Sequence, residues 1–221
     1  MMTTFTAAIT TDPTLIEFAA TYGAVLEFPP CHIIFAQGEP GYELYIIQSG
    51  KVKIVQRAHN GRENLVMVHG VSESFGELSL VDGHPREATA TTVTETRVTV
   101  IDRATLRQWL AAKPELVENM MQVLAKRVRR VSSQLSDHIF IDAAARLAKV
   151  LLLLSQRFGT YERGYLRVTH DLTQEELAQF IGSSRETVNK VLSDFAGRGW
   201  LRVEGKSVLI LDVDSLARRV R

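Results

Sequence analysis

The spacing of hydrophobic residues along the chain changes from strand-like to helix-like near residue 103. Between Phe28 and Asp102, short runs rich in Val, Ile, Thr and aromatic residues, such as ELYIIQSGKVKIVQR, are separated by glycines at the spacing of turns. This pattern predicts an all-β region. A double-sheeted jelly roll is the economical arrangement, because it leaves few strand edges exposed.

Beyond this region the hydrophobic pattern predicts helices, one of them long. A short helix is expected from Ala104 to Leu110, and Pro114 stands where a first-turn proline opens the next helix. In that helix residues recur at intervals of 4, 3, 4, 3, 4 and 3, which is the spacing of a coiled-coil seam. They are Val117, Met121, Leu124, Val128, Val131, Leu135 and His138. A stripe this narrow, flanked by the basic run KRVRR, favours a seam between two copies of the chain over a helix lying along its own β domain.

The last third of the chain predicts a small helical domain that ends in a β hairpin. Residues 142–159, DAAARLAKVLLLLSQRFG, form a helical pattern that ends at a C′ glycine, Gly159. Two more helices follow, and the segment WLRVEGKSVLILD then contains two β runs around Gly205. We therefore expect an α+β protein in three parts: a jelly-roll domain with a helical N-terminal segment (1–112), a dimerisation helix (113–139) and a C-terminal helical domain (140–221).

Composition narrows the class of protein without identifying it. The 221 residues include 23% charged and 45% hydrophobic residues, with a net charge of +1, which is typical of a soluble globular protein. The longest apolar run, VLLLLS, is too short to span a bilayer, and the N-terminus lacks the regions of a signal peptide, so a cytoplasmic location without membrane contact is expected. From residue 140 onward 13 Lys and Arg stand against 10 Asp and Glu, a mild surplus compatible with a phosphate-facing surface.

Residues with catalytic or metal-binding chemistry are too few and too scattered to indicate an enzyme. Cys31 is the one cysteine, so the sequence contains no internal disulfide, no zinc spacing of Cys and His, and no iron–sulfur ligand set. The six histidines are dispersed, and no nucleophile elbow, P-loop or His-Glu-x-x-His motif is present. We expect neither an enzyme nor a metal site. A small-molecule sensor whose helical domain binds another protein is the competing interpretation.

The segment LTQEELAQFIGSSRETVNKVLSDF (172–195) predicts a helix-turn-helix. Thr173, with Glu176 three residues later, forms a capping-box pattern for the first helix. Gly182 falls at a tight turn where glycine makes a positive φ inexpensive, and Ser183 or Ser184 can cap the second helix. With the following hairpin as its wing, the domain is a winged helix-turn-helix.

The second helix of this motif divides into a hydrophobic side and a polar side. Val188 and Leu192 gather on one side of a helical wheel that starts at Arg185, and four polar residues fall within an arc of about 140° on the other. Those four are Glu186, Asn189, Lys190 and Ser193. Recognition helices place N-terminal residues of this kind against base edges, where Arg donates two hydrogen bonds to guanine and Glu accepts from cytosine.

Several segments in order resemble the cAMP receptor protein (CRP/FNR) family of bacterial transcription regulators, and most of all its actinobacterial members. Besides the helix-turn-helix they are FAQGEPGYELYIIQSGKVKI, FGELSLVDGHPR and RRVSSQLSDHIF, and the resemblance covers nearly the whole chain. It implies a homodimer that reads a near-palindromic DNA operator with half-sites about 34 Å apart, with RNA polymerase as a further partner. The residues expected at the DNA are Thr173, Gln174, Ser184, Arg185, Glu186, Thr187, Asn189, Lys190 and Lys206.

The family resemblance also implies a cyclic nucleotide, with cAMP as the expected allosteric ligand, bound between the β roll and the long helix. The segment FGELSLVDGHPREATA (75–90) resembles the family's phosphate cassette, in which Glu77 would bind the ribose hydroxyl. Its chemistry agrees, because Gly76 allows a close backbone approach and Arg86 suits a phosphate. On these residues alone, a turn with a surface arginine would be the preferred interpretation. The expected ligand contacts are Val52, Val66, Phe75, Gly76, Glu77, Leu78, Arg86, Glu87, Val131 and Ser132.

Two of these positions depart from the pattern of cAMP-binding members. Glu87 replaces a Ser or Thr after the cassette arginine, and a carboxylate 4 Å from a phosphate costs about 4 kcal/mol at an effective dielectric of 20. Val131 replaces a Thr at the adenine, which removes a hydrogen bond worth about 0.5–1.5 kcal/mol. Either the pocket binds cAMP more weakly with Ser132 serving the base, or Glu87 pairs with Arg86 and stands in for the phosphate without ligand. A different small molecule is the third alternative.

Overall fold

The computed structural model describes residues 13–112 and 115–220, apart from some side chains of the long helix. The chain divides into two compact units whose boundary lies between Arg129 and Arg130. Each unit has its own core. Among the described residues, no helix is both long enough and apolar enough to cross a membrane.

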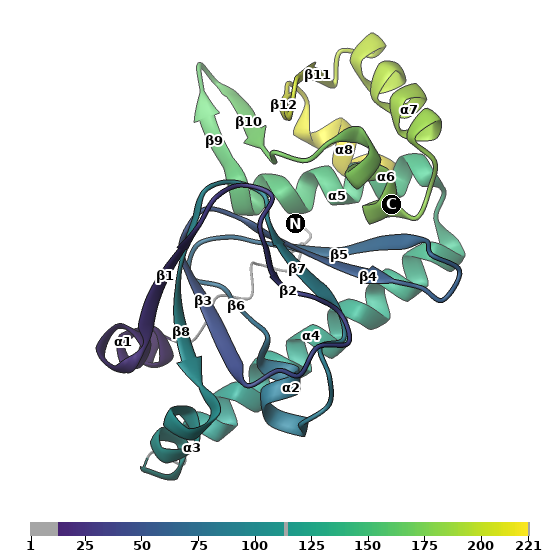
Figure 1. Ribbon diagram of the computed structural model, residues 1–221. Coiled ribbons are helices and arrows are strands. Elements are labelled where there is room, and N and C mark those ends of the chain that lie inside the picture. Colours follow the sequence, from purple (N-terminus) through teal and green to yellow (C-terminus); the bar gives the residue numbers. More distant parts are fainter. Residues whose placement is uncertain (1–12, 113–114, 221) are drawn as a thin grey trace. The chain divides into compact units, whose positions relative to one another are not determined.

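The first unit contains two four-stranded antiparallel sheets (Figure 1). One sheet has the order β1-β8-β3-β6 and the other the order β2-β7-β4-β5. The strands are β1 (Ala24–Phe28), β2 (Ile33–Phe35), β3 (Glu43–Ser49), β4 (Val52–Arg57), β5 (Glu63–His69), β6 (Ser74–Phe75), β7 (Thr89–Thr92) and β8 (Thr96–Asp102). The expected double-sheeted jelly roll is confirmed.

The central strand β3 is buried on both of its faces, so its side chains alternate between two cores. Leu44 and Ile46 pack with Trp109 beneath the helices α1 (Pro13–Tyr22) and α3 (Arg103–Ala112). Tyr45 and Ile47 pack into the space between the sheets with strand residues such as Phe75. This double burial explains the uninterrupted apolar run of β3.

Of the three short helices of the first unit, two were expected from the sequence and one was missed. Helices α1 and α3 match the expected N-terminal segment and the helix expected at Ala104–Leu110. Helix α2 (Glu77–Asp82) interrupts the strands inside the cassette segment and was not expected. It has only 6 residues, too few for a hydrophobic period to be recognised.

Helix α4 (Glu115–Phe140) carries the expected seam residues on its surface. Pro114 and the side chain of His138 lie outside the described residues. Leu124 is half-buried, and the other seam residues are 42–65% exposed. These exposed residues are Val117, Met121, Val128, Val131 and Leu135. Within the part of the chain that the structure describes, these residues leave a hydrophobic stripe exposed on α4. Its pairing with a second copy stays a prediction.

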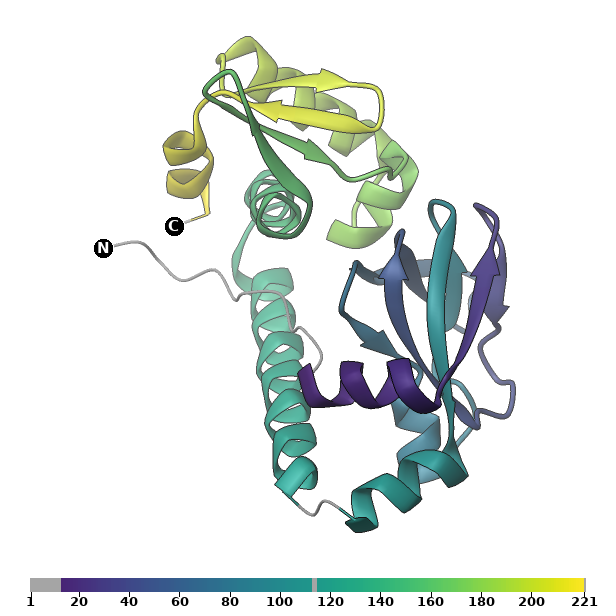
Figure 2. The same ribbon diagram turned by 90° about the vertical axis from the view of Figure 1, so that its left-hand side faces the viewer.

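The second unit surrounds helix α5 (Ala143–Phe158), which Figure 2 views nearly end-on. A four-stranded sheet of order β11-β12-β10-β9 and three further helices complete it. These elements are β9 (Gly159–Glu162), β10 (Tyr165–Thr169), α6 (Gln174–Ile181), α7 (Arg185–Gly197), β11 (Leu201–Glu204), β12 (Ser207–Ile210) and α8 (Val213–Arg219). The expected helix-turn-helix and terminal hairpin are confirmed, whereas the β9–β10 hairpin and α8 were missed.

Gly159 ends helix α5 as expected, but for a different physical reason. Its φ of −83° and ψ of 137° are extended, so it is the first residue of β9 and not a left-handed C′ cap. A Cβ at this position would lie 2.1 Å from the carbonyl oxygen of Ser155 and 2.9 Å from Cδ1 of Leu166. Glycine is required here because helix and strand approach each other too closely for a side chain.

Candidate functional site

The helix-turn-helix begins with the predicted capping box. Oγ1 of Thr173 accepts a hydrogen bond from the backbone N–H of Glu176 (3.2 Å), and the Glu176 carboxylate accepts from the Thr173 N–H (2.6 Å) and hydroxyl (2.9 Å). Two otherwise unsatisfied donors at the start of α6 are thereby paired. The Thr173 hydroxyl thus donates to Glu176 at the start of the same helix. The expected contact of Thr173 with a DNA phosphate stays a prediction.

The turn between α6 and α7 fixes where the second helix begins. Gly182 adopts the left-handed conformation with φ 59°, and Ser184 caps α7 by accepting from the backbone N–H of Thr187 (3.1 Å). Of the two serines left open by the sequence, Ser184 is therefore the cap. The hydroxyls of Ser184 and Thr187 lie 3.0 Å apart at this helix N-terminus, where the helix dipole favours an anion.

Helix α7 presents a buried hydrophobic side and a free charged side. Val188 and Leu192 are 0% and 3% exposed, so they fix the helix against its domain. Arg185, Glu186 and Lys190 are exposed, and none of the described residues forms an ion pair or side-chain hydrogen bond with them. The predicted division of the helix is confirmed, and three charged groups remain available to an external partner.

The terminal hairpin is tied to the start of the helix-turn-helix. The carbonyl oxygen of Lys206 accepts a hydrogen bond from the backbone N–H of Asp171 (3.0 Å), and the Lys206 side chain is exposed. A hollow of about 710 Å³ separates β11 from α7 and is lined by several polar side chains. Those polar residues are Gln174, Asn189, Ser193 and Arg202. Gln174 and Asn189 were expected at the DNA, so the hollow brings two expected residues together with the wing.

Arg202 is a candidate DNA contact that the sequence interpretation missed. It is exposed on β11 and lies between buried Leu201 and exposed Val203. It lines the hollow beside Asn189 and Ser193 of α7. The available signal in the sequence was an arginine within the predicted wing hairpin.

Arg86 is the centre of the candidate ligand site, and it is buried instead of lying on the surface. It is 3% exposed; Nη1 donates to the carbonyl oxygen of Gly76 (2.6 Å), and Nη2 donates to the carbonyl oxygen (3.0 Å) and the carboxylate (3.2 Å) of Glu43. The guanidinium also lies 4.1 Å over the ring of Phe35. The structure thus brings together Gly76 and Arg86, as predicted from the cassette, and adds Glu43 and Phe35.

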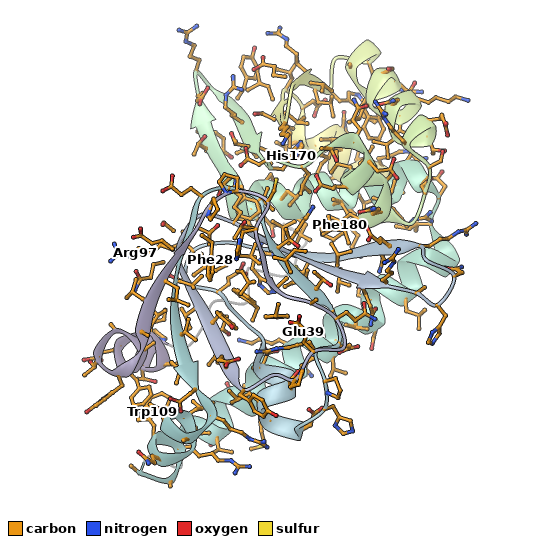
Figure 3. All side chains as sticks on the ribbon, in the orientation of Figure 1. Phe28, Glu39, Arg97, Trp109, His170 and Phe180 are labelled. Carbon is orange, nitrogen blue, oxygen red and sulfur yellow. The ribbon has the colours of Figure 1, made fainter. Side chains whose placement is uncertain are left out.

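The backbone around Arg86 is held by the loop before β3. The Arg86 N–H donates to the carbonyl oxygen of Glu39 (2.7 Å), and its carbonyl oxygen accepts from Gly38 (2.8 Å); Figure 3 labels Glu39 in this loop. Gly41 must be a glycine, because a Cβ there would lie 2.5 Å from Nε of Arg86. Nε has no hydrogen-bond partner among the described residues. A guanidinium offers five N–H donors, so the contacts within the chain do not use all the donors of Arg86.

Burial shapes the charge of this site. Burial is the largest influence on Arg86 and lowers its pKa, while Tyr45 and then Glu43 raise it again. The same surroundings raise the pKa of Tyr45, chiefly through burial and then through Glu43. An arginine remains protonated under these conditions, so a positive charge is held inside the roll.

Glu87 does not pair with Arg86, so the hypothesis that Glu87 stands in for the phosphate in this way is wrong. Glu87 is exposed, whereas the Arg86 next to it is buried, so the two side chains diverge. The Glu87 carboxylate accepts a hydrogen bond from Nε2 of Gln56 on β4 (3.3 Å). The carboxylate partner of Arg86 is Glu43, which the sequence interpretation missed.

The remaining expected ligand contacts occupy different environments. Val52 (0% exposed) and Phe75 (2% exposed) belong to the core between the sheets. Glu77 is buried at the first position of α2, Leu78 is exposed, and Val66 is half-buried. The other two contacts, Val131 and Ser132, are exposed on α4 in the second unit. Their expected contact with a base stays a prediction.

Comparison with known proteins matches each of the two domains to a family. A model of the cyclic nucleotide-binding domain matches residues 25–113, and a model of the Crp-like helix-turn-helix domain matches residues 145–219.

Related proteins match nearly the whole length of the chain. The CRP-like cAMP-activated global transcriptional regulator of Mycobacterium tuberculosis is 60% identical over 210 residues, which cover 95% of this chain and 94% of that protein. The cyclic AMP receptor protein of Thermus thermophilus is 33% identical, covering 86% of this chain and 85% of its own. The solved structure of the c-di-GMP responsive global regulator CLP from Xanthomonas campestris matches with a TM-score of 0.75 and 26% identity, covering 90% and 99% of the two chains. The chain therefore belongs to the CRP/FNR family of transcription regulators, which are DNA-binding proteins and not enzymes.

Proposed function

We propose that this chain is a homodimeric transcription regulator whose binding to a near-palindromic operator is controlled by cAMP. The observation that carries the proposal is the set of exposed Arg185, Glu186 and Lys190 on the first half of α7, which have no side-chain partner among the described residues. A buried arginine in the matched cyclic nucleotide-binding domain supplies the second part, because it can bind a phosphate. The M. tuberculosis relative that covers 95% of the chain is itself cAMP-activated by name.

The same proposal assigns a role to each of the three expected parts of the chain. Residues 1–112 bind the nucleotide, residues 113–139 pair two copies through the hydrophobic stripe of α4, and residues 140–221 bind DNA. The exposed stripe supports the pairing, since a coiled-coil seam is stable only when its hydrophobic residues face a partner. Val131 and Ser132 are the proposed contacts with the base of the nucleotide. RNA polymerase is the proposed further partner, and the cytoplasm the proposed location.

In this mechanism the nucleotide acts on a two-state equilibrium. Cyclic AMP stabilises the arrangement in which both recognition helices fit successive major grooves, and it does so only by its differential affinity for that arrangement. Arg185, Glu186 and Lys190 read base edges. Thr173, Ser184 and Thr187 contact the phosphate backbone, and Lys206 lies in the wing. The competing sensor that binds another protein would have a partner whose affinity depends little on salt.

The decisive experiment is a DNA titration with cAMP and without it, at two salt concentrations. The operator sequence is first obtained by selecting the duplexes that the protein binds from a pool of random DNA. We expect tight binding only with cAMP, falling steeply with salt because bound counterions are released from DNA. Lys190→Ala should weaken binding, whereas the matched control Arg62→Ala, an exposed arginine in the β roll, should leave it unchanged. Salt-insensitive binding, or equal losses in both variants, would reject DNA recognition by α7.

The ligand is tested separately by calorimetry with cAMP, cGMP and cyclic di-GMP. Cyclic di-GMP is included because the structurally similar CLP regulator is described as responsive to it. A heat of binding that is measured with cAMP, and not with the other two nucleotides, would support the proposal. Tight operator binding without any nucleotide would favour the alternative regulator that is active without ligand, although pairing of Glu87 with Arg86 no longer provides its mechanism.

A further inference from the structure

We propose that Glu43 is a built-in counter-ion that competes with the ligand's phosphate for Arg86 and thereby sets the affinity of the nucleotide site. The inference rests on the proposed function only in assuming that the natural ligand presents an anion to Arg86. It adds a residue that controls affinity and that lies 43 positions before its partner, outside the cassette segment.

The position of the Arg86 guanidinium does not depend on the Glu43 carboxylate. Two backbone carbonyls hold it, from Gly76 at 2.6 Å and from Glu43 itself at 3.0 Å. The ring of Phe35 supports one face at 4.1 Å, and the ring of Tyr45 lies 5.8 Å from the same group. A substitution confined to the carboxylate therefore leaves the arginine in place.

The carboxylate contributes charge compensation instead of shape. Its Oε2 lies 3.2 Å from Nη2 of Arg86, whose side chain is only 2% exposed, while the Glu43 side chain is 40% exposed. A buried arginine without a counter-ion is destabilising, so the pair stabilises the ligand-free protein. Oε2 of Glu43 also accepts from the backbone N–H of Tyr42 (3.3 Å), which lies in the exposed loop before β3. Because the Glu43 side chain reaches into solvent, its carboxylate is able to move away at the cost of this long contact and without disturbing β3.

A phosphate bound to Arg86 makes the Glu43 charge unfavourable. Two anions that share one guanidinium repel each other, and the repulsion is screened little beside a buried group. Two nearby carboxylates have other partners: Glu39 accepts from the backbone N–H of Ala36 (2.9 Å), and Glu87 accepts from Gln56 (3.3 Å). Glu43 is the carboxylate that is ion-paired with Arg86, so it is the one that the ligand must displace or tolerate.

The test replaces Glu43 by glutamine, which keeps the shape and one oxygen acceptor but removes the charge. We expect Glu43→Gln to bind cAMP about fivefold to tenfold more tightly in calorimetry, since the opposing coupling is lost. The ligand-free variant should melt at a lower temperature than the wild type, and cAMP should raise its melting temperature more. If Glu43 instead served to orient Arg86, the variant would bind cAMP equally or more weakly, and the proposal would be overturned.

Two control variants separate this effect from a general change in charge. Glu27→Gln breaks another Glu–Arg pair of the roll, with Arg97 on β8 at 3.6 Å, and should leave cAMP affinity unchanged. In an Arg86→Ala background, Glu43→Gln should no longer strengthen binding. A gain that persists without Arg86, or that Glu27→Gln reproduces, would also overturn the proposal.

Inorganic phosphate keeps the test independent of the nucleotide. If the wild type binds none of the three nucleotides, the proposed ligand fails, but melting temperatures in phosphate and in chloride at equal ionic strength still decide the role of Glu43. We expect phosphate to stabilise Glu43→Gln more than the wild type, and the difference to vanish in Arg86→Ala. Equal responses of Glu43→Gln and the wild type would reject competition at Arg86.

Discussion

At the scale of single residues, Glu87 shows how one hydrogen bond can direct a charge. Its carboxylate is exposed at the edge of the cassette and is bound by Nε2 of Gln56 at 3.3 Å. Glu87 directly follows Arg86, so an unrestrained carboxylate would be free to approach any phosphate bound there. The amide of Gln56 favours an orientation in which this approach does not occur.

Gln56→Ala should therefore weaken cAMP binding by about 0.5–1 kcal/mol, because the released Glu87 charge can approach the phosphate. In a Glu87→Thr background the same change should have no effect. Calorimetric titration of the four proteins that form this cycle measures the coupling. Equal effects of Gln56→Ala in both backgrounds would show that Gln56 does not act through Glu87.

The residues around Arg86 also show how far a sequence can define a site. Gly76 and Arg86 could be predicted because they lie in one short segment with a recognisable chemistry. Glu43 and Gln56 could not, because they lie 43 and 31 positions from their partners, and only the pairing of strands brings them near. The expected partnership of Glu87 with Arg86 failed because adjacency along the chain does not make two side chains meet.

At the scale of secondary-structure elements, α5 is fastened at its first turn. Asp142 caps the helix by accepting from the backbone N–H of Ala145 (2.8 Å), and its other oxygen accepts from Arg219 of α8 (2.5 Å). The hydrogen bond from Ala145, followed by the one from Arg219, lowers the pKa of Asp142. Asp142 therefore links the first turn of α5 to α8.

Asp142→Ala should lower the free energy of unfolding of the second unit by about 1 kcal/mol, the usual cost of losing a cap. Asp142→Asn retains a capping oxygen and should cost less. Urea titration in a Trp109→Phe background reports on this unit through Trp200, the other of the two tryptophans. A larger loss in Asp142→Asn than in Asp142→Ala would contradict the capping role.

The pH dependence of this cap follows from the depressed pKa of Asp142. A carboxyl with a lower pKa in the folded state binds its proton more readily when unfolded, so its contribution is present above the unfolded value of about 3.9 and is lost as pH falls through the folded value. The difference in stability between the wild type and Asp142→Asn should therefore shrink below about pH 4. A difference that grew on acidification would show the opposite linkage.

Long elements with a clear hydrophobic period were predicted correctly, and the elements that were missed are short. Helix α7 has buried Val188 and Leu192 opposite charged residues, which is a readable helical pattern. Strand β9 is largely exposed, and the β9–β10 turn at Arg163–Gly164 lacks the usual Asn-Gly or Asp-Gly signal, although both residues have positive φ. Such a hairpin is specified by its cross-strand partners and not by its own composition.

At the scale of the whole molecule, the exposed stripe of α4 predicts that the single chain is not the functional species. Val128 is 65% exposed, so a lysine there is tolerated within one chain but would meet its counterpart at a coiled-coil seam. Two buried or closely spaced lysines oppose association.

Val128→Lys should convert the dimer to a monomer and abolish operator binding at saturating cAMP, with little change in the melting temperature of the β roll. Light scattering after size-exclusion chromatography measures the mass, and a DNA titration measures the binding. Gln122→Lys adds the same charge at an exposed position outside the stripe and should remain dimeric. A dimeric Val128→Lys would place the interface elsewhere.

The boundary between the two units falls inside α4, with Val117, Met121 and Val128 before it and Val131 and Leu135 after it. A truncation for crystallisation or NMR that is placed at the boundary between the units would therefore cut through the helix and its stripe. A fragment starting at Asp142 would discard the entire stripe, and one ending at Arg129 would carry only its first half. A fragment of either unit should therefore include the whole of α4, so that it can still pair with a second copy.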